Sequence, residues 1–162
     1  MRDHPNVRTV QDSLIAVDAV NGSGQPSEIR ILPDAVTTAV AAAAALGVEV
    51  GAIANSLIFA ADGEPVLVLT SGAHRVDTVK VAAGLGVSGL KRATPDFVRD
   101  HTGQTIGGVS PLGHPKPVRT LVDTALEQYP EVWAAGGVAH AVFPTTYHEL
   151  VRITAGTPTD VA

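Results

Sequence analysis

The residues with the clearest chemical potential form the glycine-rich segment Gly107-Gly108-Val109-Ser110-Pro111-Leu112-Gly113. Glycine lets backbone N–H groups approach a ligand closely, and converging N–H groups bind a carboxylate or phosphate or stabilise a developing oxyanion. The ring of Pro111 would stiffen this loop. The segment is not a P-loop, because no Gly-Lys-Ser/Thr follows it, and Ser110 lacks the two flanking glycines of a nucleophile elbow. It predicts either a ligand-binding loop or a structural turn.

Polar side chains also interrupt or end two apolar runs. Asn55 lies in the middle of Ile53-Ala54-Asn55-Ser56-Leu57-Ile58-Phe59, and Thr70-Ser71 ends a second run. Because a buried amide or hydroxyl needs a hydrogen-bond partner, these groups either bond within the chain or point into a pocket. Lys80 follows on an expected helix, from which its amine would reach solvent or cap the end of a strand, and it is also a candidate for contact with a ligand.

The histidines and the absence of cysteine limit the chemistry further. None of the six histidines has the spacing of a zinc-binding HExxH helix, and zero cysteines exclude thiolate metal sites and a cysteine nucleophile. His140 follows Gly136-Gly137, where glycines permit close approach of a ligand or of another backbone segment. These three residues are therefore site candidates, with a structurally hydrogen-bonded histidine as the alternative. We expect no metal and no cofactor.

Composition and charge indicate one domain and a possible anionic ligand. The chain has 162 residues, of which 45% are hydrophobic and 17% charged, with a net charge of −5, as expected for a single domain over residues 1–162. No apolar stretch is long enough to cross a membrane, so we expect a cytoplasmic protein. Seven of the eleven basic residues, but only three acidic ones, lie between Arg75 and Arg119. They either gather around a phosphate-bearing ligand or are scattered over the surface.

Hydrophobic periodicity predicts the elements that must position these residues. Helical spacing marks residues 7–20, an alanine-rich helix opened by Pro33-Asp34 and ended by Gly47, residues 76–85 and residues 95–101, with shorter helices at 124–128 and 145–151. Strands are expected at 28–32, 52–60, 65–70, 118–122, 132–135 and 139–143, and Asp62-Gly63 predicts a hairpin between the second and third. Because strands and helices do not alternate regularly, we expect an α+β fold with a mixed sheet.

Together, several of these segments resemble the YbaK/EbsC family of aminoacyl-tRNA deacylases, which includes the editing domain of prolyl-tRNA synthetase. The similarity runs from about Asp34 to Thr154 and includes IANSLIF, PVLVLTSG, RVDTVKVAAGLG, TGQTIGGVSPLGH and AAGG. The resemblance implies a strongly curved mixed sheet surrounded by helices. It also implies hydrolysis of mischarged aminoacyl-tRNA, commonly tRNA for proline carrying a small wrong amino acid, with prolyl-tRNA synthetase as a further partner.

The resemblance also suggests roles for individual residues. The backbone of Gly107–Gly113 would hold the aminoacyl ester, with Gly108 as an oxyanion donor. Gly136, Gly137 and His140 would form a second wall, where His140 would define the pocket or help in proton transfer. A lysine is frequent in the family where this chain has Asn55, whose amide can orient a water or a carbonyl but brings no charge. Two alternatives stay open: a module that binds aminoacyl-tRNA or a nucleotide without hydrolysing it, and a protein that acts on a small ester unrelated to tRNA.

Overall fold

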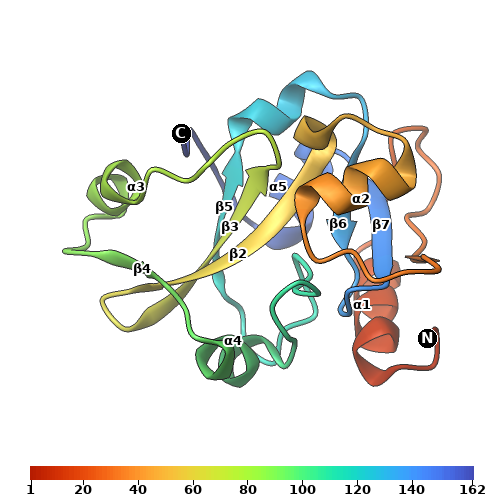
Figure 1. Cartoon of the computed structure of the whole chain (residues 1–162), viewed down its shortest axis with the longest axis horizontal. Helices are drawn as coiled ribbons and strands as arrows, with labels where there is room; N and C mark the ends of the chain where they lie inside the picture. Colours follow the sequence, from red (N-terminus) through yellow and green to blue (C-terminus); the bar gives the residue numbers. More distant parts are fainter.

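The computed structural model describes residues 1–162 and shows an open, mixed sheet of eight strands with five α-helices around it (Figure 1). The strands are β1 (Arg30–Ile31), β2 (Ile53–Ala61), β3 (Glu64–Ser71), β4 (Leu90–Arg92), β5 (Arg119–Asp123), β6 (Val132–Ala135), β7 (Ala141–Thr145) and β8 (Thr157–Thr159). The helices are α1 (Pro5–Ala16), α2 (Ala39–Leu46), α3 (Thr78–Leu85), α4 (Pro95–Thr102) and α5 (Tyr147–Thr154), with 3₁₀ turns η1 (Val50–Ala52) and η2 (Thr124–Gln128). The predicted α+β class with a mixed sheet is confirmed.

The long β2–β3 hairpin forms the centre of the sheet. Its strands pair antiparallel from Ala54 opposite Ser71 to Ala61 opposite Glu64. Asp62 and Gly63 connect them with φ values of 49° and 89°, which is the pair of positive angles that a tight type I′ turn requires. The remaining strands extend the sheet in the order β1-β7-β6-β2-β3-β5-β8, and β4 pairs with the end of β2.

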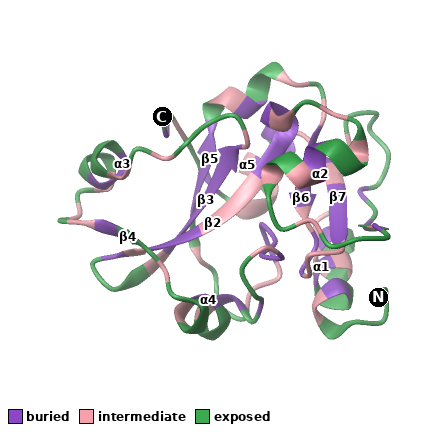
Figure 2. Cartoon of the chain, viewed as in Figure 1, coloured by how far each residue is buried: buried purple, intermediate pink, exposed green.

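The two faces of β2 contribute to different cores, because successive side chains of a strand point to opposite sides. Ala54 and Ile58 belong to the largest buried cluster, which α1, α4 and α5 cover. Ile53 packs with α2 in a second cluster, and Phe59 packs with α3 in a third. Figure 2 shows β3 and β5 buried at the centre of the molecule and β2 half-buried in its middle, whereas the outer surfaces of the helices are exposed. None of the helices has both the length and the apolar character needed to cross a membrane.

Several element boundaries differ from the expected ones for local reasons. The alanine-rich helix begins at Ala39 instead of Pro33-Asp34, because the Thr38 hydroxyl caps it by accepting the N–H of Ala41 at 3.1 Å. Helix α1 ends at Ala16, shortly before Asp18 adopts a φ of 51°. The last predicted strand lies two residues later, at 141–145, and the short strands β4 and β8 were not predicted.

Candidate active site

The candidate active site lies where the outer edge of β2 has no strand beside it. Strand β6 pairs with residues 53–54 of β2, and β4 pairs with residues 59–61, so the edge between them is open. On this side Ala93 donates its N–H to the C=O of Ile58 at 3.1 Å. Along a strand, the backbone N–H and C=O groups of every second residue point to the same side. Ser56 comes two residues before Ile58, so its N–H and C=O point into the same opening.

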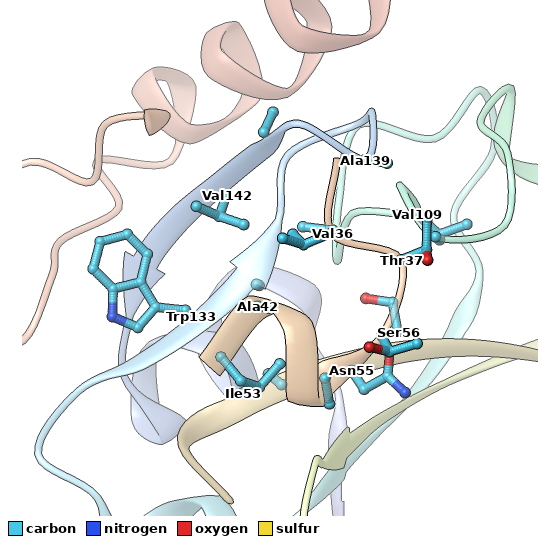
Figure 3. Close-up of a pocket in the computed structure, with 17 residues that line it drawn as sticks. Val36, Thr37, Ala42, Ile53, Asn55, Ser56, Val109, Trp133, Ala139 and Val142 are labelled. Carbon is cyan, nitrogen blue, oxygen red and sulfur yellow. The ribbon is translucent and has the colours of Figure 1, made fainter. Parts of the chain in front are cut away.

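A small apolar recess opens from this gap and contains about 480 Å³ of space, including open solvent at its mouth. Its wall is built mainly from small or branched side chains and contains no charged residue. Figure 3 shows Trp133 and Val142 at one end of the recess, and Asn55 and Ser56 at the other end, near Val109. The full lining is Val36, Thr37, Thr38, Ala39, Ala42, Ile53, Ala54, Asn55, Ser56, Gly107, Val109, Trp133, Ala134, Ala135, Ala139, Ala141 and Val142.

A wider and more polar pocket continues from the mouth of the recess and contains about 1290 Å³, including open solvent. Thr37–Ala39, Asn55, Ser56, Gly107 and Val109 line both spaces, so they form the lip between them. The far side of the wide pocket carries three residues that can bear positive charge, and no aspartate or glutamate lines it. These three residues are His74, Arg75 and Arg92.

The polar groups at the lip are not fully hydrogen-bonded within the chain. The Ser56 Oγ atom is buried without a hydrogen-bond partner. Asn55 is half-buried and stands directly opposite Thr70 in the β2–β3 register. The Oγ1 atom of Thr70 is likewise buried without a partner, although Thr70 itself lines neither cavity. Because an unsatisfied buried hydroxyl is costly, the lip around Asn55 and Ser56 is prepared to accept hydrogen bonds from a ligand or to donate them.

The glycine-rich loop divides into a part at the pocket and a part that anchors it. Gly107 and Val109 line both cavities. Ser110 is fully buried instead: its N–H donates to Gln104 Oε1 at 2.8 Å, and the Gln104 amide donates to Ser110 Oγ at 3.0 Å. His114 Nε2 lies 2.8 Å from the Ser110 C=O, and burial lowers the pKa of His114, so the neutral ring donates this hydrogen bond.

The second half of the loop faces away from both cavities. Pro111 and Gly113 line a separate surface depression, and a Cβ atom on Gly113 would lie 3.3 Å from Ser13 Oγ of α1. Of the loop residues expected to contact substrate, the structure therefore brings Gly107 and Val109 to the lip, whereas Ser110, Pro111 and Gly113 anchor the loop to the body of the protein.

Gly108 and the Gly136–His140 turn meet directly behind the lip. A Cβ atom on Gly108 would lie 2.6 Å from the Cα of Val138, so only glycine permits this backbone contact. Gly137, at a φ of 106°, packs in the same way against the backbone of Asn6. Neither cavity is lined by Gly108, Gly136, Gly137 or His140, although Ala139 and Ala141 beside His140 line the recess.

Two further expected residues lie away from the lip. Ser71 is buried, and its hydroxyl donates to the C=O of Gly51 at 2.8 Å. The Lys80 amine donates to the Asp160 carboxylate and to the C=O of Ala162, both at 2.8 Å, and lines neither cavity. No group of three histidine, aspartate or glutamate side chains is arranged to hold a metal ion.

One wall of the site was not predicted from the sequence. The extended segment before α2 forms one wall, because Val36 donates its N–H to the C=O of Ala139 at 2.8 Å and is thereby held against the turn before β7. Its Thr37 and Thr38 line both cavities, but only the helix-capping pattern marks them in the sequence. Of the seven basic residues in the middle of the chain, Arg75 and Arg92 line the wide pocket, whereas the other five do not.

Comparison with known proteins places this geometry in a family. Residues 33–153 match the model of the aminoacyl-tRNA editing domain. A proline–tRNA ligase of Nitratidesulfovibrio vulgaris strain DP4 is 39% identical over 82 residues, which are 51% of this chain and 14% of the ligase. The uncharacterized protein YwhH of Bacillus subtilis strain 168 is 31% identical over 110 residues, which are 67% of this chain and 69% of YwhH. The chain thus corresponds to a small part of the ligase.

A solved structure extends the similarity to nearly the whole fold. The crystal structure of a proposed trans-editing enzyme for prolyl tRNA synthetase superimposes with a TM-score of 0.86 and 39% sequence identity. The superposition covers 97% of this chain and 96% of the other. These matches confirm the resemblance found in the sequence, to a family of aminoacyl-tRNA editing domains. The chain belongs to the aminoacyl-tRNA editing domain family.

Proposed function

We propose that this protein is a trans-editing hydrolase that cleaves the ester between a small wrong amino acid and the 3′-terminal adenosine of tRNA for proline. The observation that carries this proposal is the junction of two unlike cavities at the open edge of β2. One is small and apolar (Figure 3), the other is wide and lined by arginine, and a lip with hydrogen-bonding groups separates them. The end of an aminoacylated tRNA has three matching parts: an amino-acid side chain for the recess, an ester for the lip and a nucleotide for the wide pocket.

The recess supports selection of a small amino acid. Its wall is rich in alanine, and Ile53 and Trp133 limit its depth. A pocket of fixed size discriminates by exclusion, and each methylene group changes the transition-state free energy by about 1–3 kcal/mol. Side chains as small as those of alanine, cysteine or serine fit this description, whereas a longer or branched side chain would collide with the wall.

The wide pocket supports binding of the tRNA acceptor end. Arg75 and Arg92 reach it from different segments, and the Arg92 guanidinium lies 5.8 Å from the centre of the Phe59 ring. Arginine binds phosphate through paired N–H donors and also stacks on flat rings such as nucleobases. Although the chain is acidic overall, the absence of carboxylates from this pocket leaves a local positive potential for a phosphate backbone.

The lip supports hydrolysis without a side-chain nucleophile. An aminoacyl ester is already activated, so holding it beside a positioned water can supply much of the rate acceleration. We assign the backbone N–H groups of Gly107 and Ser56 to the developing oxyanion, because Gly107 lines the lip and the Ser56 N–H points into the opening beside it. The Asn55 amide orients the water or the carbonyl, and the Ser56 hydroxyl provides a further hydrogen bond.

The choice of tRNA for proline rests on the relatives. The ligase that matches is a proline–tRNA ligase, and the superimposed structure is that of a proposed trans-editing enzyme for prolyl tRNA synthetase. Prolyl-tRNA synthetase is accordingly the partner we propose, since it produces the mischarged tRNA.

The experiment is deacylation of purified tRNA for proline charged with alanine, cysteine, serine or proline, with correctly charged alanyl-tRNA as a further control. We expect fast release of one small wrong amino acid and no release of proline. Asn55→Ala should lower that rate by about 10²-fold or more, while uncharged tRNA binds as before. Binding without turnover would instead identify a non-catalytic module. Binding that does not weaken with salt would indicate a small-molecule ligand in place of tRNA.

A further inference from the structure

A histidine–carboxylate pair stands at the edge of the wide pocket and has no part in the mechanism described so far. Asp123, the last residue of β5, is completely buried. Its Oδ2 atom accepts the N–H of Ser71 at 3.0 Å and lies 2.9 Å from Nδ1 of His74. Its Oδ1 atom accepts the N–H of Ala125 at 2.9 Å. The buried carboxylate therefore joins the end of β3 and its following turn to the start of η2.

This arrangement fixes the protonation pattern of the imidazole. A carboxylate can only accept hydrogen bonds, so the nitrogen that faces Asp123 must carry the proton. In the neutral ring the other nitrogen, Nε2, is then the proton acceptor. The His74 side chain is 33% exposed and lines the wide pocket, so Nε2 is on the accessible side of a ring whose Nδ1 is held from behind.

The position of His74 is set by the central strands. Its N–H donates to the C=O of Ser71 at 2.9 Å in the turn that ends β3, and the N–H of Gly72 donates to the C=O of Ile53 in β2 at 2.8 Å. The imidazole is thus attached to the same pair of strands that carries Asn55. The other charged groups near it are Arg75, which follows in the chain, and Asp160 after β8, which forms an ion pair with Lys80 of α3 at 2.8 Å.

Where His74 lies relative to the two cavities indicates which part of the substrate it meets. It lines the wide pocket but not the recess, so it is on the nucleotide side of the lip. His140, the histidine expected from the sequence to help in proton transfer, lines neither cavity. Only His74 among the histidines lines the wide pocket.

We propose that His74 is the proton-transfer residue of the deacylation and that Asp123 is its positioning residue. This inference rests on the proposed function. As a water oxygen bonds to the ester carbonyl carbon, Nε2 takes the proton that the water loses, and Asp123 stabilises the resulting imidazolium. Nε2 then returns the proton to the ribose oxygen as the bond between this oxygen and the carbonyl carbon breaks. The products are the free amino acid and the ribose hydroxyl, and His74 is neutral again.

The test is the single-turnover deacylation rate of wild type, His74→Gln, His74→Ala and Asp123→Asn as a function of pH, after subtraction of the uncatalysed rate. His74→Gln should lower the rate by about 10²–10⁴-fold and remove the acidic limb of the profile, while affinity for uncharged tRNA changes little. The substrate's own amino group titrates equally with every variant, so the difference between profiles reports on the enzyme. Added imidazole should partly restore His74→Ala, and Asp123→Asn should lose rate while it keeps its circular dichroism spectrum.

The matched control is His148→Gln. His148 also faces a carboxylate, that of Glu127 at 3.4 Å, but its side chain is 79% exposed and lines neither cavity, so its rate and profile should equal those of wild type. If wild type is active and His74→Gln has the same pH profile, the inference about His74 is wrong, whereas the proposed function still holds. The inference would also be overturned if His74→Ala weakened tRNA binding without a loss of rate and without rescue by imidazole. A wild type that deacylates no aminoacyl-tRNA would refute the proposed function together with it.

Discussion

The close contact between Gly108 and Val138 predicts that one added methyl group will disturb the site. In Gly108→Ala the new Cβ atom would lie 2.6 Å from the Cα, 2.8 Å from the carbonyl carbon and 3.0 Å from the nitrogen of Val138. Carbon atoms in favourable contact are about 3.5–4.0 Å apart, so the two backbone segments must separate by about 1 Å. Backbone atoms cannot rotate away as a side chain can, and overpacking of this kind costs about 1–3 kcal/mol of stability.

The same separation should affect catalysis, because Gly108 lies between Gly107 and Val109 of the lip. A displacement of about 1 Å in a positioning element can reduce the rate by about 10²-fold. Urea unfolding measures the first effect, and single-turnover deacylation measures the second. The matched control is Gly84→Ala in α3, where an added Cβ meets nothing within 4 Å, and which should stabilise the protein by about 0.5–1 kcal/mol. If Gly108→Ala matched Gly84→Ala in stability and wild type in rate, the two walls would not be in the tight contact described.

Three further predictions test other parts of the site. Ala42→Leu fills the recess, so it should lower the deacylation rate of tRNA charged with cysteine more than that of tRNA charged with alanine, by about 10-fold or more, without weakening tRNA binding. If both rates were equally affected, Ala42 would not belong to the wall that selects the amino acid. Arg92→Gln removes one phosphate contact, so a plot of log affinity for tRNA against log salt should lose about one unit of slope, and an unchanged slope would refute that contact. His114→Gln should flatten the loss of stability in acid. Burial lowers the pKa of His114 below 6.5. As the pH falls below 6.5, the unfolded chain therefore takes up a proton that the folded protein does not. The free energy of unfolding of wild type, measured in urea, should then fall by up to about 1.4 kcal/mol per pH unit relative to that of the variant.

The parts of the fold that could be predicted from sequence are those with a local cause. The β2–β3 hairpin follows from Asp62-Gly63, because few residue pairs tolerate two positive φ angles. The end of α2 follows from Gly47, which adopts a φ of 68° as a left-handed cap. In each case the chain's immediate neighbours decide the conformation, so the signal lies within a few residues.

The strands that shape the site depend on pairing across the chain and gave no such signal. Strand β4 has three residues, of which Lys91 and Arg92 are exposed, and its pairing with the end of β2 is a tertiary contact. The gap between β4 and β6 on the edge of β2 exists only because both strands are short. Local hydrophobic periodicity cannot reveal it, and for the same reason it could not identify Ser56 as a lip residue.

The glycine-rich loop shows how composition can indicate a site without dividing its residues correctly by role. Converging N–H groups were expected along all of Gly107–Gly113, yet the side chain of Gln104 takes the N–H of Ser110 and thereby turns the second half of the loop inward. Gln104 is itself buried, so this hydrogen bond is protected from water and holds Gly107 at the lip. The residues that shape this lip thus lie partly outside the motif. A site that hydrolyses an activated ester needs position more than reactive side chains, and such positioning comes from buried hydrogen bonds and sheet edges that a motif does not contain.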